Sequence, residues 1–339
     1  MSRRAPVLGF LLLLSTLLAA CSDEFLERVQ ATSDNLDSWF ARKGVVAQEP
    51  TAAAPRSAEP AGPDRVYQEG LALKRDGAPA KAAERFQVAA EAGHSAAAYE
   101  LAEAYWQGDG VARDDEAATK WLTTAADRGE PRAQYLLGAA YYGGLGVEQD
   151  DALALHWLGE AATRGHDRAQ FLLAEAFANG RGVETDLAWA ARWYGKAARQ
   201  GHSGAQLAYG LLLAKGRGLP ADDVQGYTWL TIAARNGQAA AEAARGGVAQ
   251  RLRPEQRAAA EAEADHFRPR ANTRFADPPT VMYVQYRLSR LGFPVGGVDG
   301  LMGPRTRDGI HAYQRARGRP TDGRLTPDLL IALLQEPKV

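Results

Sequence analysis

The sequence predicts an all-α protein in which a helix-turn-helix repeat solenoid precedes a small three-helix domain. The first observation is a 36-residue period shared by several columns of residues, which is typical of stacked repeat units. The second is that apolar residues within each period recur at helical spacing. The third is a set of three more apolar helical stripes after residue 280, separated by glycine and proline.

The composition of the 339-residue chain excludes some classes of function. With 40 basic and 41 acidic residues the formal net charge is −1, so the chain offers no basic face for nucleic acid. Hydrophobic residues make up 46% of the chain, but many are alanine, which favours helices and close helix contacts. The single cysteine, Cys21, excludes an intramolecular disulfide.

The amino terminus has the pattern of an export signal. Arg3 and Arg4 precede an apolar run from Val7 to Ala20, which has 14 residues where a membrane-spanning helix needs about 20. A charged start, a short apolar stretch and small residues at its end predict a signal peptide over residues 1–20.

The end of this run, Leu18-Ala19-Ala20-Cys21, resembles the lipobox of bacterial lipoproteins. The resemblance implies that Cys21 becomes lipidated, which makes the membrane a partner through a lipid anchor. Ser22 after the cysteine favours the outer membrane over the inner membrane in that family. Residues 21–65 then form a tether whose Pro/Ala-rich part predicts an extended, semi-stiff linker.

Four columns of residues keep the 36-residue step, and each has a role in a pair of helices. An aspartate precedes the second helix as its N-cap, a glycine ends that helix, and a Gly-x-Gly pair turns the chain between the helices. A tryptophan fills the gap between units. The columns are Asp114, Asp150, Asp186 and Asp222; Gly93, Gly129, Gly165, Gly201 and Gly237; the pairs beginning at Gly108, Gly144, Gly180 and Gly216; and Trp121, Trp157, Trp193 and Trp229.

The text AQYLLGAAYYGGLGVEQDDALALHWLGEAATRGH resembles the Sel-one-like repeat, a relative of the tetratricopeptide repeat. The resemblance covers about Ala97 to Gly237, with a degenerate earlier unit from Tyr67 and a closing cap over Ala239–Phe267. The predicted array therefore spans residues 66–268. Stacked helical pairs form a curved solenoid, and the resemblance implies that its concave face binds one or more unidentified envelope proteins.

After a linker over residues 269–279, residues 280–336 predict three helices. The text from Leu291-Gly292-Phe293 through Val298-Asp299-Gly300 to Gly303-Pro304 resembles the peptidoglycan-binding domain found beside many cell-wall hydrolases. Residues 280–339 hold nine bases and five acids, and this net +4 charge would attract the carboxylates of wall peptides. The candidate contacts are Arg305, Arg307, His311 and Arg315.

No pattern of catalytic, metal or cofactor chemistry emerges from the sequence. His94, His166 and His202 share one repeat position after glycine, which makes them repeat residues rather than zinc ligands. The Gly-x-Gly turns lack the strand-to-helix setting of a phosphate loop. We therefore expect no enzyme, no metal and no cofactor.

These features together predict a non-enzymatic scaffold or adaptor lipoprotein of the bacterial envelope. It would face the periplasm, bind peptidoglycan through its last domain and bind protein through its array. Two alternatives stay open. One is a peptidoglycan hydrolase, with an unrecognised site in the array, or a direct regulator of such an enzyme. The other is an exported factor that interacts with a host.

Overall fold

The computed structural model describes residues 62–144, 147–270 and 276–337. Within these ranges the chain forms fifteen α-helices and no strands. In chain order they are α4 (Pro63–Arg75), α5 (Pro79–Glu91), α6 (Ser95–Gln107), α7 (Asp115–Asp127), α8 (Pro131–Gly143), α9 (Asp151–Thr163), α10 (Asp167–Asn179), α11 (Leu187–Arg199), α12 (Ser203–Lys215), α13 (Asp223–Arg235), α14 (Ala239–Ala249), α15 (Pro254–His266), α16 (Pro278–Arg290), α17 (Pro304–Ala316) and α18 (Pro327–Gln335).

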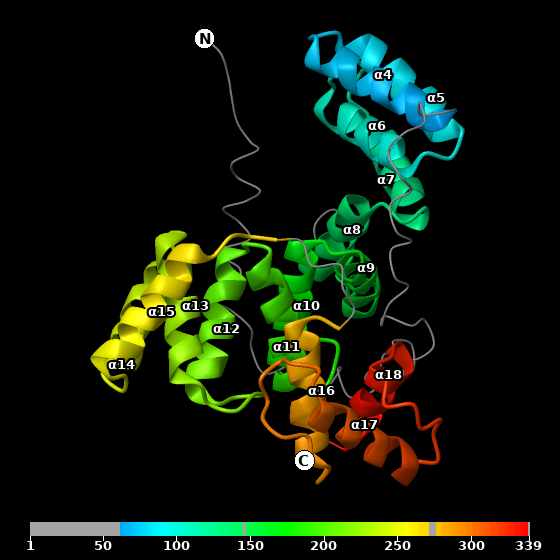
Figure 1. Cartoon of the computed structure of the whole chain (residues 1–339). Helices are drawn as coiled ribbons and strands as arrows, with labels where there is room; N and C mark the ends of the chain where they lie inside the picture. The colour runs from blue at the N-terminus through cyan, green and yellow to red at the C-terminus, as the bar shows by residue number, and fades with distance from the viewer. Residues whose placement is uncertain (1–61, 145–146, 271–275, 338–339) are drawn as a thin grey trace.

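The helices from α4 to α13 form five consecutive pairs, which we number as the first to fifth units. Each helix packs on its neighbours in the chain, and the pairs stack from blue to yellow-green in Figure 1. Helices α14 and α15 close the array against α13. Helices α16 to α18 form the C-terminal domain (Figure 1). The predicted all-α solenoid with a small helical domain is confirmed.

Repeat columns set the ends of the helices. The Asp186 carboxylate accepts a hydrogen bond from the Trp189 amide at 2.9 Å, and Asp114, Asp150 and Asp222 cap their helices in the same way. Glycine is required in the turn before α13, because a Cβ on Gly218, whose φ is +75°, would lie 2.3 Å from the Leu187 oxygen.

A buried glutamine joins the first helix of a unit to the second helix of the unit before it. In α8, α10 and α12 its side-chain amide donates to a carbonyl oxygen of the preceding helix. The pairs are Gln134 to Ala126 at 3.0 Å, Gln170 to Ala162 at 3.0 Å and Gln206 to Ala198 at 3.2 Å. Because both groups are buried, each bond satisfies a carbonyl that would otherwise carry a desolvation cost.

The tryptophan column is buried to different degrees along the array. Trp193 and Trp229 are buried, whereas Trp121 and Trp157 are partly exposed. The difference arises because α11 and α13 are covered by further helices, α16 and α15 respectively, while α7 and α9 have no such cover among the described residues.

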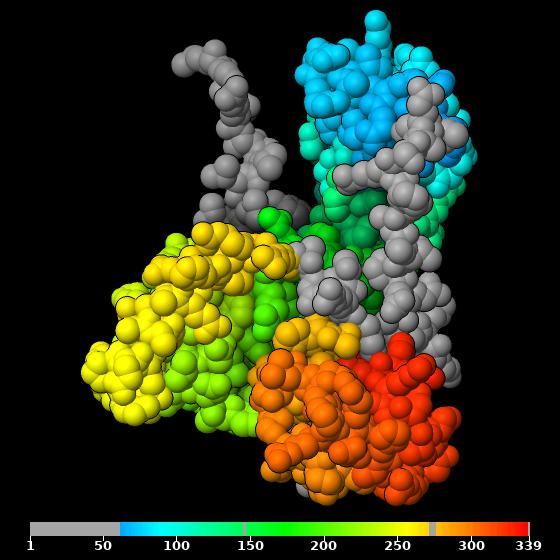
Figure 2. Space-filling model, in the orientation of Figure 1, coloured from blue at the N-terminus to red at the C-terminus, as the bar shows by residue number. Residues whose placement is uncertain are grey.

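One hydrophobic core runs from the array into the C-terminal domain. It joins Leu173 and Trp193 of the array to Tyr283, Ile310 and Leu330 of helices α16, α17 and α18. Figure 2 shows the C-terminal domain seated directly against the repeat helices. The domain and the array therefore share packing and are not joined by the chain alone.

Candidate binding surfaces

Helix α16 is fixed to α11 by two buried polar contacts. The Arg192 guanidinium donates to the Thr280 hydroxyl at 3.1 Å, and Lys196 Nζ lies 2.5 Å from Asp277 Oδ2. The Lys196 side chain is 11% exposed and that of Asp277 is 0% exposed. Burial lowers the pKa of Lys196, with Asp277 opposing the shift, and it lowers the pKa of Arg192 to about 10. Both partners of each contact are buried, so a shift of α16 on α11 would leave a buried polar or charged group without its partner.

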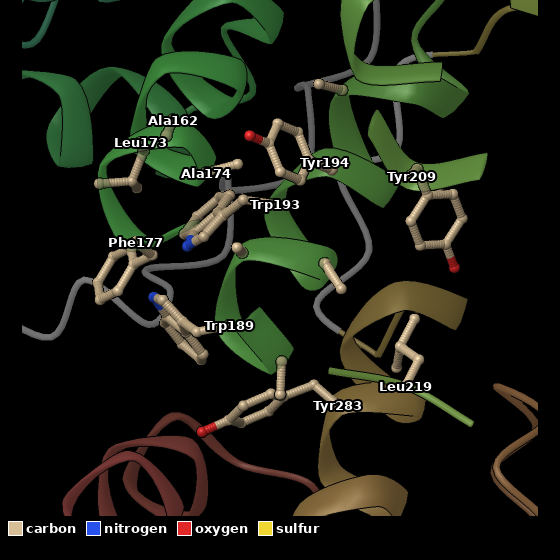
Figure 3. Close-up of a cluster of buried hydrophobic side chains, with 14 of the residues drawn as sticks. Ala162, Leu173, Ala174, Phe177, Trp189, Trp193, Tyr194, Tyr209, Leu219 and Tyr283 are labelled. Atoms are coloured by element: carbon tan, nitrogen blue, oxygen red, sulfur yellow. The ribbon is translucent and has the colours of Figure 1, made fainter. Parts of the chain in front are cut away.

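Aromatic rings fill the rest of this interface. Tyr283 of α16 packs edge-on against Trp189 of α11, with ring centroids 4.9 Å apart, and both side chains are fully buried. Trp189 also contacts Phe177 and Trp193, as Figure 3 shows. The Arg192 guanidinium lies over both indole rings, 4.6 Å and 4.3 Å from their centroids.

The other side of α16 holds the loop that leads into α17. The amide nitrogen of Gln285 donates to Asp299 Oδ1 at 2.8 Å and to the Thr306 hydroxyl at 2.9 Å. The amide oxygen of Gln285 accepts from the backbone N–H groups of Asp299 and Gly300. Helix α16 thus connects the array to the loop before the predicted wall-binding residues.

The structure places the four candidate wall-binding residues on helix α17. Arg307, His311 and Arg315 are four residues apart and share one face of the helix, whereas Arg305 lies off that face. The three arginines are exposed and His311 is partly buried, with its ring against Gly323. Arg307 donates to the Met302 carbonyl at 3.2 Å.

Within the array, ion pairs bridge the first helices of successive units. Glu100 of α6 pairs with Lys74 of α4 at 2.7 Å and with Arg132 of α8 at 3.2 Å. The Arg132 guanidinium also lies 4.1 Å from the centroid of the Tyr99 ring. These contacts link α4, α6 and α8, and two of the side chains involved, Glu100 and Tyr99, are buried.

Several predicted features lie outside the described residues. They include the signal peptide, Cys21 and most of the tether. No helix in the described part of the chain combines the length and apolar character needed to cross a membrane. Across residues 62–144, 147–270 and 276–337, no three His, Cys, Asp or Glu side chains are grouped to hold a metal ion.

Two known families match the chain in the regions just described. The Sel1 repeat matches residues 61–94, 95–130, 131–166, 167–202 and 203–238, which together are more than half of the chain. The chain belongs to the Sel1 repeat family. The match over 61–94 includes the unit that the sequence marked as degenerate. The family described as "Putative peptidoglycan binding domain" matches residues 277–333, so the C-terminal domain is of the peptidoglycan-binding type.

Solved structures share the Sel1 fold. A protective antigen present in uropathogenic Escherichia coli strains, described as displaying an SLR fold, is 33% identical with a TM-score of 0.51. That match covers 61% of this chain, and this chain spans 45% of the length of that protein. A Sel1 repeat protein from Oxalobacter formigenes is 24% identical with a TM-score of 0.50, and the match covers 68% of this chain and 97% of that one. No curated protein matches the sequence.

Sequence reasoning missed the contact between the array and the peptidoglycan-binding domain. A signal for it was present at one position of the repeat. Trp189 stands where other units carry Ala117, Leu153 and Gln225. A large aromatic residue on the outer side of one second helix indicates that something covers that helix.

Proposed function

We propose that this Sel1-repeat protein is a scaffold of the bacterial envelope that holds a protein partner next to peptidoglycan. The observation that carries the proposal is the joining of a repeat array to a peptidoglycan-binding domain through one shared core. A partner bound to the array would then be held at a fixed distance and orientation from the wall. Residues 66–268 would act as the array and residues 280–336 as the wall domain, with 269–279 linking them.

In this proposal the wall ligand meets the exposed face of α17. Arg307 and Arg315 would attract carboxylates of the wall peptides, with His311 between them and Arg305 nearby. Such exposed charges act through screened attraction, so binding should weaken as salt rises.

Co-sedimentation with purified sacculi tests the wall-binding part. The double substitution Arg307→Glu and Arg315→Glu should leave most of the protein in the supernatant. The matched control is Lys81→Glu with Lys120→Glu, which makes the same change in net charge on exposed array helices. Equal pelleting of both double variants would overturn the role of α17.

Point variants are preferable to a truncation here. Removing α16 to α18 would expose Trp189 and Arg192, which are buried under α16. A truncated array could then fail for reasons unrelated to wall binding. Charge reversals on α17 leave the α11–α16 interface intact.

The amino-terminal part of the proposal is lipid anchoring. A signal peptide over residues 1–20 would be removed, Cys21 would carry the lipid, and residues 21–65 would tether the array to the periplasmic side of a membrane, with the outer membrane preferred. Metabolic labelling with radioactive palmitate should mark the native protein but not the Cys21→Ala variant. Labelling of both would remove the anchor from the proposal.

The scaffold is proposed to be non-enzymatic, in keeping with matched families of the repeat and binding types. Incubation of the purified protein with sacculi should release no muropeptides, and release would favour the alternative of a hydrolase. A second candidate, an exported host-interaction factor, rests on the similarity to a protective antigen. Protease accessibility on intact cells would support that candidate and count against a periplasmic scaffold.

A further inference from the structure

Helix α9 repeats two of the features by which α11 receives α16. In α11 the Trp189 ring packs against α16, and a Cβ on Gly195 would lie 2.9 Å from Pro279 Cγ, so the glycine lets α16 come close. One period earlier, α9 carries Leu153 in place of Trp189 and Gly159 in place of Gly195. The second and fifth units carry threonine where α9 and α11 carry this glycine. Helix α9 therefore has the pattern of a helix that receives another helix.

The outward face of α9 is apolar and accessible. Leu153 is 39% exposed, and Trp157, one helical turn later, is partly exposed. Ala152 and Leu155 of the same helix pack with the core that the array shares with the C-terminal domain. The face of α9 therefore continues the α11–α16 interface into the third unit, and no helix of the described residues packs along it as α16 packs along α11.

The chain itself offers an occupant between Cys21 and Gly44, outside the described residues. Its large apolar side chains recur at i, i+4, i+11, i+14 and i+15, which is one face of a helix. They are Phe25, Val29, Leu36, Trp39 and Phe40. Acidic residues at its start and Arg42-Lys43 before Gly44 agree with the two ends of such a helix. The sequence therefore predicts an amphipathic helix over residues 23–43, which needs an apolar surface to cover its stripe.

The charge of this segment favours a protein surface over a lipid surface. Residues 23–43 hold five acids and three bases, and two of the three bases lie in the last turn. Helices that lie on anionic membranes carry lysine and arginine along their polar face, whereas the polar face here is mainly acidic. An anionic lipid surface would repel it.

The chain between the predicted helix and the array is long enough for this contact. Residues 44–61 comprise 18 residues, and as an extended Pro/Ala-rich segment they reach about 56 Å. Packed helices lie about 8–10 Å apart, so the axis of α9 is at most about 50 Å from that of α4, where the described chain begins. The stacking of helices in pairs shortens this distance further, as Figure 1 shows.

We propose that residues 23–43 form a helix that docks on the outward face of α9, with Leu153 and Trp157 at the centre of the contact and Gly159 at its closest approach. Helix α9 would then hold the amino-terminal helix as α11 holds α16. The docking itself needs no lipid. Its consequence rests on the proposed lipid anchor, because Cys21 directly precedes the docked helix. The lipid would then hold the array close to the membrane and not at the end of a long tether.

Photo-crosslinking in the full chain, purified in detergent, tests where the segment lies. Leu153→p-benzoyl-phenylalanine should crosslink, on illumination, to a peptide from residues 23–43 in a product that migrates as a monomer. The matched control is Val88→p-benzoyl-phenylalanine, at an apolar position of α5 that is 50% exposed. Equal yields of this product from both positions, or none from Leu153, would overturn the docking.

Hydrogen exchange of the amides in residues 23–43 measures the strength of the contact. Leu153→Asp should lower their protection about tenfold, the effect of losing one apolar contact, whereas Val88→Asp should leave it unchanged. Both positions are exposed, so neither substitution should lower the melting temperature. Unchanged protection in Leu153→Asp would overturn the role of α9.

Variants of the segment test its apolar stripe against its charge. Val29→Asp with Leu36→Asp places two carboxylates in the stripe, and Gln30→Asp with Ser38→Asp places two on the opposite side of the predicted helix. Only the first pair should abolish the crosslink from Leu153→p-benzoyl-phenylalanine. Equal loss in the two double variants would overturn docking through the stripe.

The same experiments identify other occupants and separate this proposal from the proposed function. A crosslinked product of dimer size would assign the face of α9 to a second copy and overturn docking within one chain. Loss of the crosslink on adding phosphatidylglycerol vesicles would assign the segment to the membrane and overturn it as well. If palmitate fails to label the protein but the crosslink forms, the anchor is lost and the docking stands. If palmitate labels the protein but no crosslink forms, the docking is overturned and the lipoprotein scaffold stands.

Discussion

Helices α7 and α11 occupy the same place in the repeat, yet their surroundings differ sharply. Both have thirteen residues and begin after a capping aspartate. Four residues of α7 are buried, whereas ten residues of α11 are buried. The shared part of the sequence therefore builds the stack, and the outward side chains decide whether a further domain covers it.

The outward positions make this difference concrete. In α7 they are Ala117, Lys120 and Thr124, and in α11 they are Trp189, Arg192 and Lys196. On α11, Trp189 packs against Tyr283 of α16. The two cations, Arg192 and Lys196, contact Thr280 and Asp277 respectively. The array thus uses its fourth unit for internal docking, whereas no helix of the described residues covers α7 of the second unit.

The largest expected effect comes from removing the aromatic centre of this interface. Trp189→Ala should lower the free energy of unfolding by about 3–5 kcal/mol, because it leaves a cavity between fully buried rings. Trp121→Ala on α7 should cost less than half as much, since Trp121 is partly exposed. Urea denaturation followed by circular dichroism measures both. Similar losses in the two variants would break the contrast between the helices.

The buried ion pair gives the next effect. Lys196→Met leaves the Asp277 carboxylate buried beside one fewer partner, at a cost of about 3–5 kcal/mol. The control is Arg235→Met, which removes one side of an exposed pair with Asp265 and should cost about 0–1 kcal/mol. Chemical denaturation separates these values. A loss under 1 kcal/mol for Lys196→Met would mean that the aromatic contacts and the Arg192–Thr280 hydrogen bond hold α16 without help from this ion pair.

The repeat architecture could be read from the sequence because its determinants are local. Asp186 caps its own helix and Gly218 supplies the positive φ of its own turn, so each can be recognised from a few residues of the chain, although the close approach of Gly218 to Leu187 joins neighbouring units. The 36-residue step repeats this local information in every unit. Consistency across units is what made the solenoid predictable.

The docking of α16 could not be derived in the same way. Thr280 lies 88 residues from Arg192, and a pairing at that distance leaves no period in the sequence. Trp189 indicated that something covers α11 but not which helix does so. The sequence marked the candidate residues of α17 as polar and basic. The bounds of the helix then show that Arg307, His311 and Arg315 share one face of it. Their contact with the wall stays a prediction.

Protonation should weaken the units next to the docked helix. His166 and His202 cap α10 and α12 by accepting amide hydrogen bonds at Nδ1, and burial lowers the pKa of both. Because the folded pKa lies below the unfolded value near 6.5, their contribution to stability is present above that pH. It is lost as pH falls through the lowered folded pKa.

Unfolding free energies measured between pH 7.5 and pH 5 should therefore decline, since the unfolded chain binds more protons there. Replacing both histidines with asparagine, which also caps helices but does not titrate, should flatten part of this slope. An unchanged slope in that double variant would assign the pH dependence to other groups.

The smallest effect is expected from moving the docking residues to the open helix. Ala117→Trp, Lys120→Arg and Thr124→Lys would copy the α11 surface onto α7, where no helix of the described residues covers it. Each substitution should change the unfolding free energy by no more than about 0.5 kcal/mol, the usual range for surface positions. Thermal melts of the triple variant measure this directly. A gain comparable to the loss in Trp189→Ala would show that these side chains stabilise a repeat helix by themselves, and burial under α16 would then not explain the difference between α7 and α11.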